Sequence, residues 1–192
     1  RTRASIAKEK GLESLADAIF AQVADSASPT ELAADYIDAE KGVETAEDAI
    51  NGAMDIIAEN ISDDADIRRR LRSLFTVAGV LQSRAADSEK ESVYTMYYEY
   101  DEPVNKIAGH RVLAVNRGEN EGFLKVGIDV DRIKALNIIN ANVLSDNGSA
   151  CTDTVRDAAA DAYDRLIFPS VERETRNMIT DSAVESALKV FY

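Results

Sequence analysis

The chain has 192 residues, of which 45% are hydrophobic and 30% are charged, and its formal net charge is −13 at pH 7. This hydrophobic content suffices for a packed core, and no apolar run reaches the roughly 20 residues that span a bilayer, so we expect no membrane partner. Nucleic-acid binding normally requires a basic face, because phosphate neutralisation supplies most of the affinity. The acidic balance therefore argues against strong nucleic-acid binding by this chain alone.

The single cysteine, Cys151, excludes an internal disulfide and is typical of a reducing compartment. No apolar stretch follows the basic first residues, so no secretory signal is predicted. We expect a cytoplasmic protein. The chain begins with arginine and its last amphipathic pattern is still running at Tyr192, which indicates a piece of a longer protein.

Helical periodicity dominates the first part of the chain. Apolar residues recur at helical spacing over 12–23. Ser28, Pro29 and Glu31 follow as an N-cap, a first helical residue and a capping-box acid. They predict a helix over 29–38.

Two further helices are expected before the chain changes character. Thr45 is the predicted N-cap of a helix over 45–61, after a turn that contains glycine. An apolar stripe over 67–78 predicts the next helix, and Gly79 marks its end. A short turn between helices 29–38 and 45–61 is also compatible with a helix-turn-helix unit.

Two short runs in the middle of the chain are rich in β-branched or aromatic residues. They are "GVLQSR" at 79–84 and "GFLKVGID" at 122–129. We expect segments near 79–84 and 123–129 to pair as a two-stranded antiparallel ribbon around the residues between them. The tyrosine cluster inside is predicted to pack rather than stack on bases, because acidic neighbours would repel phosphates; it comprises Tyr94, Tyr97, Tyr98 and Tyr100.

Helical patterns return after the second strand candidate. An apolar stripe over 155–166 is expected to break at Pro169. Thr180 is then the predicted N-cap of a last helix, whose apolar face carries Val184, Leu188 and Phe191.

The predicted fold is mainly α, a multi-helix assembly with a small two-stranded antiparallel β element. Three segments follow from this order. An N-terminal helical segment with helix-turn-helix-like pairs covers 1–79. A ribbon with inserted tyrosine-rich and His-Arg helices covers 80–129, and a C-terminal helical segment covers 130–192.

Arginines are the candidate nucleic-acid contacts. The densest basic cluster, "IRRRLR", follows "DDAD" at 63–66. Asp64 with Arg68, and Asp66 with Arg70, have the favourable i,i+4 order for pairing within one helix, which favours a solvated, self-paired face over a phosphate site. The residues named as candidate contacts are Arg68, Arg69, Arg72, Arg84, Arg111 and Arg117.

The only histidine lies in "GHRVLAVNRGE". His110, Ala114 and Arg117 share one helix face, and Gly118 occupies the position expected of a helix C-cap. We predict a docked helix with a hydrogen-bonded, partly buried His110. Its replacement by alanine should then cost about 1–3 kcal/mol, and Arg117 should behave similarly.

No pattern of catalytic chemistry is visible. The chain lacks a phosphate loop, a nucleophile elbow and a dinucleotide fingerprint. Cys151 has no nearby histidine or second cysteine and is expected to be a free thiol beside a helix start. The sequence therefore predicts no catalytic residue, no metal, no cofactor and no enzymatic activity.

Several segments together resemble the Tex family of bacterial transcription accessory proteins. They occur in the family's order and cover almost the whole chain: "RTRASIAKEKGLESLADAI", "ELAADYIDAEKGVETAEDAINGAMDIIAE", "YYEYDEPVNKI", "GHRVLAVNRGENEGFLKV" and "DAYDRLIFPSVERETRN". Where the family usually has proline and serine before the histidine, this chain has Ala108 and Gly109, so glycine is expected to replace the serine N-cap of that helix.

The resemblance implies part of the helical N-terminal half of a longer protein, before an RNase-H-like domain. It implies that nucleic acid is bound chiefly by domains outside this chain. The implied function is a helical scaffold, and the isolated chain is expected to bind RNA and DNA weakly. One alternative is a protein-interaction module that docks on RNA polymerase or other transcription factors. Another is a nucleic-acid-binding helix-turn-helix.

Overall fold

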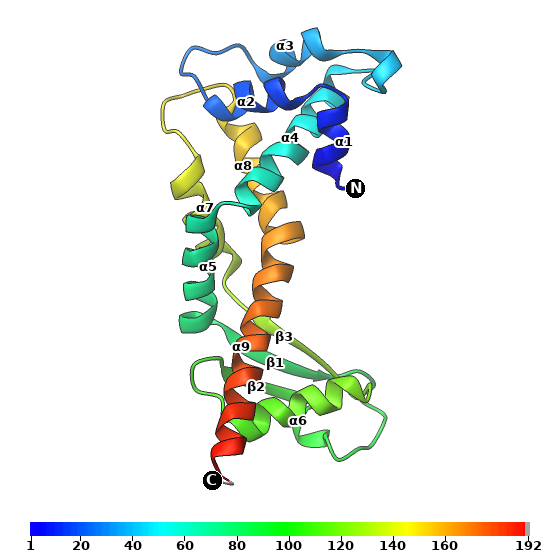
Figure 1. Cartoon of the computed structure of the whole chain (residues 1–192), viewed down its shortest axis with the longest axis vertical. Coiled ribbons are helices and arrows are strands. Elements are labelled where there is room, and N and C mark those ends of the chain that lie inside the picture. Colours follow the sequence, from blue (N-terminus) through cyan, green and yellow to red (C-terminus); the bar gives the residue numbers. More distant parts are fainter. Residues whose placement is uncertain (191–192) are drawn as a thin grey trace. The chain divides into compact units, whose positions relative to one another are not determined.

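The computed structural model describes residues 1–190, so Phe191 of the predicted last helix lies outside the described residues. The fold is mainly α with one small sheet (Figure 1). The α-helices are α1 (Arg3–Glu9), α2 (Glu13–Ala21), α3 (Pro29–Ala33), α4 (Ala46–Ser62), α5 (Ala65–Ala78), α6 (Gly109–Asn120), α7 (Arg132–Val143), α8 (Thr152–Asp161) and α9 (Phe168–Lys189). The strands are β1 (Val80–Ala85), β2 (Glu99–Pro103) and β3 (Leu124–Asp129).

The chain forms two compact units, each made of two stretches of sequence. The first unit comprises Arg1–Arg68 with Leu136–Phe168, and the second comprises Arg69–Ala135 with Pro169–Tyr192. The three sequential segments at 1–79, 80–129 and 130–192 stay a prediction. No helix among residues 1–190 has the length and apolar character needed to cross a bilayer.

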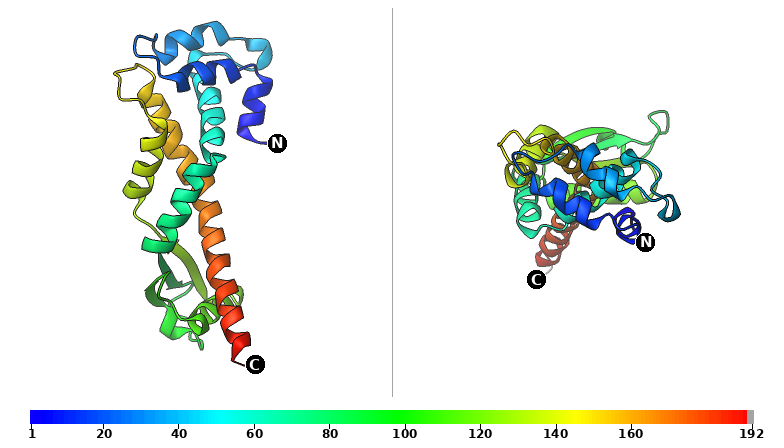
Figure 2. Two further views of the ribbon diagram at one scale, coloured as in Figure 1. Left: turned by 60° about the vertical axis from the view of Figure 1, so that its left-hand side comes forward. Right: turned by 90° about the horizontal axis from the view of Figure 1, so that it is seen from above.

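The first unit is built around α4, which packs against α1, α2, α3 and α8 (Figure 2). Thr45 caps α4 by accepting the backbone N–H of Asp48 at 3.0 Å, as predicted. The apolar residues of α4 are buried, as are Leu12, Leu15 and Ile19 in and next to α2, which packs against α4. Burial of these aliphatic side chains is the main stabilising contribution in this unit.

The predicted start of the helix after residue 28 is confirmed, but its predicted end at residue 38 is wrong. Ser28 accepts the backbone N–H of Glu31 at 3.2 Å, and Pro29 is the first helical residue. The α-helix stops at Ala33 and continues only as a 3₁₀ turn over Ala34–Tyr36. A 3₁₀ turn is a common way for a helix to end.

Two expectations about the C-terminal helices are wrong. Every residue from Thr152 to Lys189 is helical, so the apolar stripe is not broken at Pro169 and no new helix begins at Thr180. A π-helical segment, Ala162–Ile167, comes directly before α9. Proline lacks an N–H and its ring crowds the carbonyl four residues earlier, and the wider π turn accommodates both effects without ending the helix.

The second unit contains a three-stranded antiparallel sheet of order β2-β1-β3, within residues 1–190. β1 pairs with β3 in the predicted antiparallel manner, with Leu81 opposite Ile128. The prediction of only two strands is wrong, because β2 pairs with the other edge of β1, with Ser83 opposite Tyr100. The sequence of β2, "EYDEP", is acidic and ends in proline, which are features of an edge strand rather than a sheet core.

The tyrosine cluster packs, as predicted. Tyr94 and Tyr97 are each 5% exposed, and the ring of Tyr97 meets that of Tyr100 edge-on with centroids 5.3 Å apart. The hydroxyl of Ser83 donates to the carbonyl of Tyr97 at 2.7 Å. These contacts join the tyrosine-rich segment to β1.

α6 covers the face of the sheet that carries the buried residues of β1 and β3. The sequence suggested that Gly118 caps this helix, and this prediction is wrong. Gly118 lies inside the helix and is buried. The left-handed residue is Gly122, with φ +83°. The N–H of Phe123 donates to the carbonyl of Gly118 at 2.9 Å and that of Gly122 to Glu119 at 3.0 Å, which is the Schellman arrangement.

The N-terminus of α6 also differs from the sequence expectation. The N-cap is Ala108 rather than Gly109, and no side chain caps the helix there. Gly109 instead lies against α9, where a Cβ on residue 109 would come within 3.1 Å of the Cα of Ala183. The position without a side chain therefore serves helix packing.

Candidate functional site

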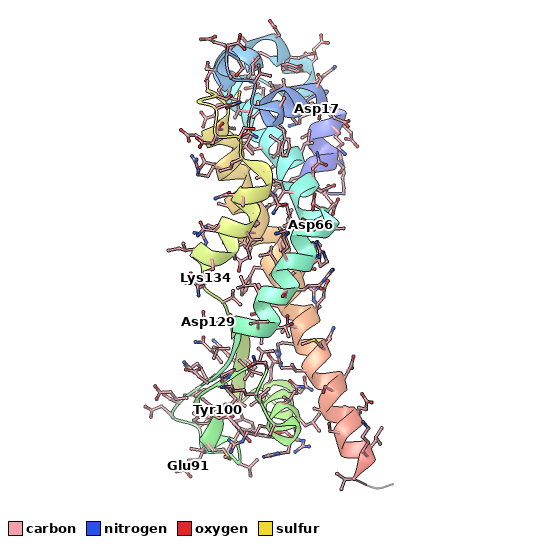
Figure 3. The ribbon with its side chains drawn as sticks, turned by 90° about the vertical axis from the view of Figure 1, so that its left-hand side faces the viewer. Asp17, Asp66, Glu91, Tyr100, Asp129 and Lys134 are labelled. Atoms are coloured by element: carbon pink, nitrogen blue, oxygen red, sulfur yellow. The ribbon has the colours of Figure 1, made fainter. Side chains whose placement is uncertain are left out.

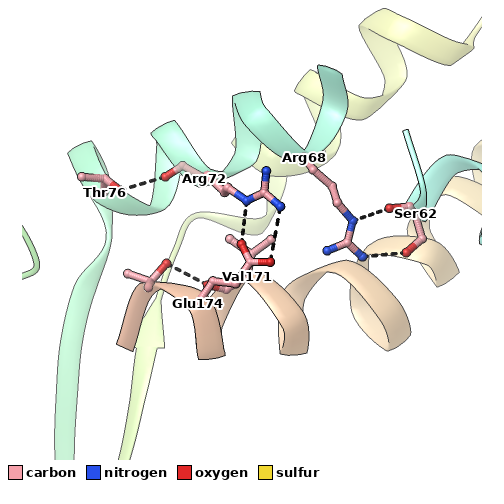
Figure 4. A network of polar contacts seen from close by, with 7 residues as sticks. Ser62, Arg68, Arg72, Thr76, Val171 and Glu174 are labelled. Atoms are coloured by element: carbon pink, nitrogen blue, oxygen red, sulfur yellow. Dashed lines mark hydrogen bonds and ion pairs between the residues drawn. The ribbon is translucent and has the colours of Figure 1, made fainter. Parts of the chain in front are cut away.

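Arg68 and Arg72, two of the six candidate arginines, lie on α5 and donate hydrogen bonds to residues outside that helix (Figure 4). In the first unit, Arg68 donates through Nε to the carbonyl of Ser62 and through Nη2 to its hydroxyl at 3.0 Å. In the second unit, Arg72 donates to Glu174 through Nε at 2.6 Å and through Nη2 at 3.3 Å. Both guanidinium groups are thus oriented by partners within this chain.

Arg84 is held on β1 by Asp101 of β2. Its Nη1 donates to Asp101 Oδ1 at 2.8 Å and its Nη2 donates to Oδ2 at 3.2 Å. This bidentate pair lowers the pKa of the Asp101 carboxyl from its ordinary value. Since side chains alternate along a strand, Arg84 lies on the sheet face opposite the buried Ser83.

Arg111 lies on the other side of the sheet, above the ring of Tyr100 at 5.5 Å. Burial raises the pKa of the Tyr100 hydroxyl, Glu102 raises it further, and Arg111 opposes the shift. Arg111 and Arg84 therefore belong to opposite faces of the sheet. Arg69 and Arg117 are exposed on α5 and α6, and the six arginines are spread over several surfaces.

The prediction that His110 is partly buried is wrong. His110 is exposed, as is Arg117 on the same face of α6, whereas Val112 and Val115 are buried. The helical spacing correctly placed His110 and Arg117 together. It did not show that the valines would face the sheet and the histidine would face solvent.

The structure reveals a polar cleft that the sequence did not predict. It has a volume of about 560 Å³ and lies between α6, β3 and α9 in the second unit. The left view of Figure 2 shows the later turns of α9 beside α6 and the sheet. Its walls comprise Asn116, Glu119 and Asn120 of α6, Val126 of β3, and Pro169, Glu172, Arg173, Arg176, Asn177 and Thr180 of α9.

Arg176 lines this cleft, and its side chain is 19% exposed. Its Nη1 donates to Glu119 Oε2 at 2.9 Å, and its Nη2 donates to Asn116 Oδ1 at 2.7 Å. Asn116 in turn donates to the hydroxyl of Thr180 at 2.9 Å. This network fixes the guanidinium and joins α6 to α9.

The outer edge of β3 is held by the same helix. The N–H of Ile128 donates to Glu172 Oε2 at 2.9 Å, and Arg176 Nη1 donates to the carbonyl of Val126 at 3.4 Å. These α9 side chains satisfy edge groups that would otherwise be open to another strand. They also leave Glu172 and Glu119 committed to partners within the chain.

The family resemblance is the feature of the sequence that comes closest to indicating this cleft. All of its lining residues except Thr180 lie in "GHRVLAVNRGENEGFLKV" or "DAYDRLIFPSVERETRN". Glu119 and Arg176 are 57 residues apart, so helical spacing gave no indication that they meet. The candidate arginines of the sequence lie outside the cleft.

Comparison with known proteins agrees with the resemblance. Residues 24–191 match the family described as Tex central region-like. This chain belongs to that family. The protein YdcI of Bacillus subtilis is 41% identical, over 100% of this chain and 27% of its own length.

Two relatives of the Tex central region carry names that describe a role. The transcriptional accessory protein Tex of Neisseria gonorrhoeae is 31% identical, over 100% of this chain and 26% of its own length. The human S1 RNA-binding domain-containing protein 1 is 26% identical, over 99% of this chain and 20% of its own length. The chain thus spans about a quarter of the length of the Bacillus and Neisseria relatives.

Proposed function

We propose that this Tex central region is a helical scaffold of a nucleic-acid-associated transcription accessory protein, and that it has no catalytic role. Arg68, Arg72, Arg84 and Arg111 are each oriented by a carbonyl, a carboxylate or an aromatic ring within the chain. The pairing of these arginines with groups of the same chain is the observation that supports the proposal. An arginine already paired with a carboxylate contributes little to phosphate binding unless that pair is broken.

The names of the relatives support a role in transcription and an association with RNA for the longer protein. The net charge of −13 supports the view that RNA affinity resides elsewhere in that protein, since the mean field of this chain repels phosphates. The proposed contribution of this chain is to position the parts that bind.

The test is titration of labelled single-stranded RNA and DNA with the isolated chain at about 150 mM salt, near physiological ionic strength. We expect binding weaker than about 10 µM, as for non-specific contacts. Submicromolar affinity would contradict the scaffold role. In that case Arg69→Ala and Arg117→Ala, which alter exposed arginines, would locate the contact.

The second candidate function is a protein-interaction module for the transcription machinery. The cleft between α6, β3 and α9 favours it, because most of its wall residues are polar and its volume is in the range of ligand sites. The helix-turn-helix alternative has less support. α3 has only five residues, and the first turn of α4 carries Glu47 and Asp48.

A further inference from the structure

The α6–β3–α9 cleft has charged groups of two kinds. In its floor, Arg176 is neutralised by Glu119, and Glu172 accepts a backbone N–H from β3. At its rim, Arg173 is exposed and forms no ion pair among residues 1–190. The rim therefore carries one arginine that no carboxylate in the described part of the chain pairs with, above a floor in which Arg176 is paired with Glu119 and Glu172 is held by a backbone N–H.

Amide side chains flank that charge on both walls. Asn177 follows Arg173 by four residues on α9, so the two share one face of the helix, and Asn120 stands on the α6 wall. Asn177 and Asn120 are both exposed. Each amide offers both a donor and an acceptor, which is the combination needed to bind the main chain of an extended peptide.

We propose that this cleft binds an extended peptide segment of a partner protein through one acidic side chain. The carboxylate pairs with the guanidinium fork of Arg173, and Asn120 and Asn177 hydrogen-bond the peptide main chain. Arg176 keeps its partners and holds the two walls at a constant separation. This inference rests on the second candidate function, the protein-interaction module, and specifies the chemistry of the partner.

The charge of the cleft favours a peptide over a nucleic acid. A polynucleotide brings a phosphate with every residue, and Glu119 and Glu172 line the same space. A peptide brings one carboxylate and an otherwise neutral main chain, so it meets the single unpaired arginine with less repulsion. The volume of the cleft accommodates a few residues rather than a whole domain.

The probe is a library of random heptapeptides displayed on phage and selected on the immobilised chain. We expect the selected peptides to be enriched in aspartate or glutamate. Synthetic labelled versions are then titrated by fluorescence anisotropy against the parent and against Arg173→Glu. We expect the substitution to weaken binding at least about tenfold, or about 1.4 kcal/mol, and the amide version of each peptide to bind the parent equally weakly.

The matched control is Lys134→Glu. Lys134 is an exposed cation on α7 in the same unit (Figure 3), and its reversal changes the net charge by the same amount. We expect this control to bind the selected peptides within about twofold of the parent, because Lys134 does not line the cleft and solvent screens an exposed charge outside the contact. Arg173→Lys keeps the charge without the fork and should bind with intermediate affinity.

Three results would overturn the proposal. One is selection of peptides without acidic enrichment, and another is an equal loss of affinity in Arg173→Glu and Lys134→Glu. The third is Arg173→Glu weakening the binding of single-stranded RNA while leaving the peptides unaffected, which would make the cleft a nucleic-acid contact. The scaffold role fails in a different measurement, submicromolar RNA binding by the parent chain.

Discussion

Gly118 of α6 lies directly against Leu124 of β3. A Cβ on residue 118 would come within 2.5 Å of Leu124 Cδ1 and 2.9 Å of its Cγ, and within 3.1 Å of the ring of Tyr94. Alanine normally stabilises a helix interior by about 1 kcal/mol relative to glycine. Here the close approach of helix and strand outweighs that preference.

Gly118→Ala should therefore lower the free energy of unfolding, by about 1–3 kcal/mol, as overpacked cores do. Urea unfolding followed by circular dichroism measures it. Asn60→Ala, at an exposed position of α4, is the control and should raise stability by a few tenths of a kcal/mol. A Gly118→Ala variant as stable as the parent would show that α6 can shift away from β3.

His110→Ala should change stability by less than about 0.5 kcal/mol, as expected for an exposed residue without special packing. This replaces the larger loss that the sequence suggested, because His110 faces solvent. Arg117→Ala, also exposed on α6, should behave in the same way. Thermal unfolding of both variants is the measurement, and a loss above about 1 kcal/mol would indicate a partner for this face.

Arg176→Ala should destabilise the chain by about 1–3 kcal/mol, because it leaves Glu119 and Asn116 without their donor in a mostly buried position. Arg72→Ala removes an ion pair whose side chains are 49% and 42% exposed, so its cost should stay below about 1 kcal/mol. Urea unfolding of the two variants compares them directly. Equal losses would mean that the cleft network contributes no more than a surface pair.

Gln22 organises a loop of the first unit from a left-handed position. It has φ 46° and is 2% exposed. Its Nε2 donates to the carbonyl of Val143 at 2.9 Å, and its Oε1 accepts the N–H of Ser145 at 2.9 Å. The Gln22 carbonyl also accepts from the side chain of Asn147 at 2.8 Å.

Gln22→Ala should cost about 2–4 kcal/mol, because it leaves buried loop groups unsatisfied. Gln22→Gly should cost less than the alanine variant, since glycine adopts positive φ without strain. The difference between the two variants in urea unfolding isolates the backbone contribution. If glycine proves worse than alanine, the strain at residue 22 is negligible.

The stability of the first unit should depend on Asp55. Burial raises the pKa of its carboxyl above 3.8, Arg165 and Arg3 oppose the rise, and Asp161 adds to it. Because the pKa of this carboxyl is higher in the folded state, its protonated form favours folding. This stabilisation is complete below pH 3.8 and is lost as the pH rises through the raised pKa. Asp55→Asn should therefore gain stability relative to the parent on going from pH 3.5 to pH 7.

Urea unfolding of parent and Asp55→Asn at both pH values measures that gain. Asp161→Asn is the comparison, because Asp161 keeps a close pair with Arg165 at 2.9 Å, whereas Asp55 lies 4.0 Å from it. A pH-independent difference between parent and Asp55→Asn would show that this carboxyl titrates normally.

Local signals in the sequence were sufficient for several features of the fold. The capping residues Ser28 and Thr45 act within three residues of themselves, so their roles can be read directly from the chain. β1 and β3 were predicted from two short runs with β-branched or aromatic residues, which fit a pleated, half-buried surface. β2 was missed because its acidic sequence forms a strand only where β1 supplies hydrogen-bonding partners.

The sequence by itself determined the mainly helical class, the pairing of β1 with β3, the packed tyrosines and the family, because these depend on periodicity, propensity and ordered segments. Only the tertiary structure decided that His110 faces solvent, that Gly118 is a packing position, and that Glu119 and Arg176 meet in a cleft. Spacing along a helix shows which residues share a face. Which way that face points depends on neighbours that lie far away in the chain.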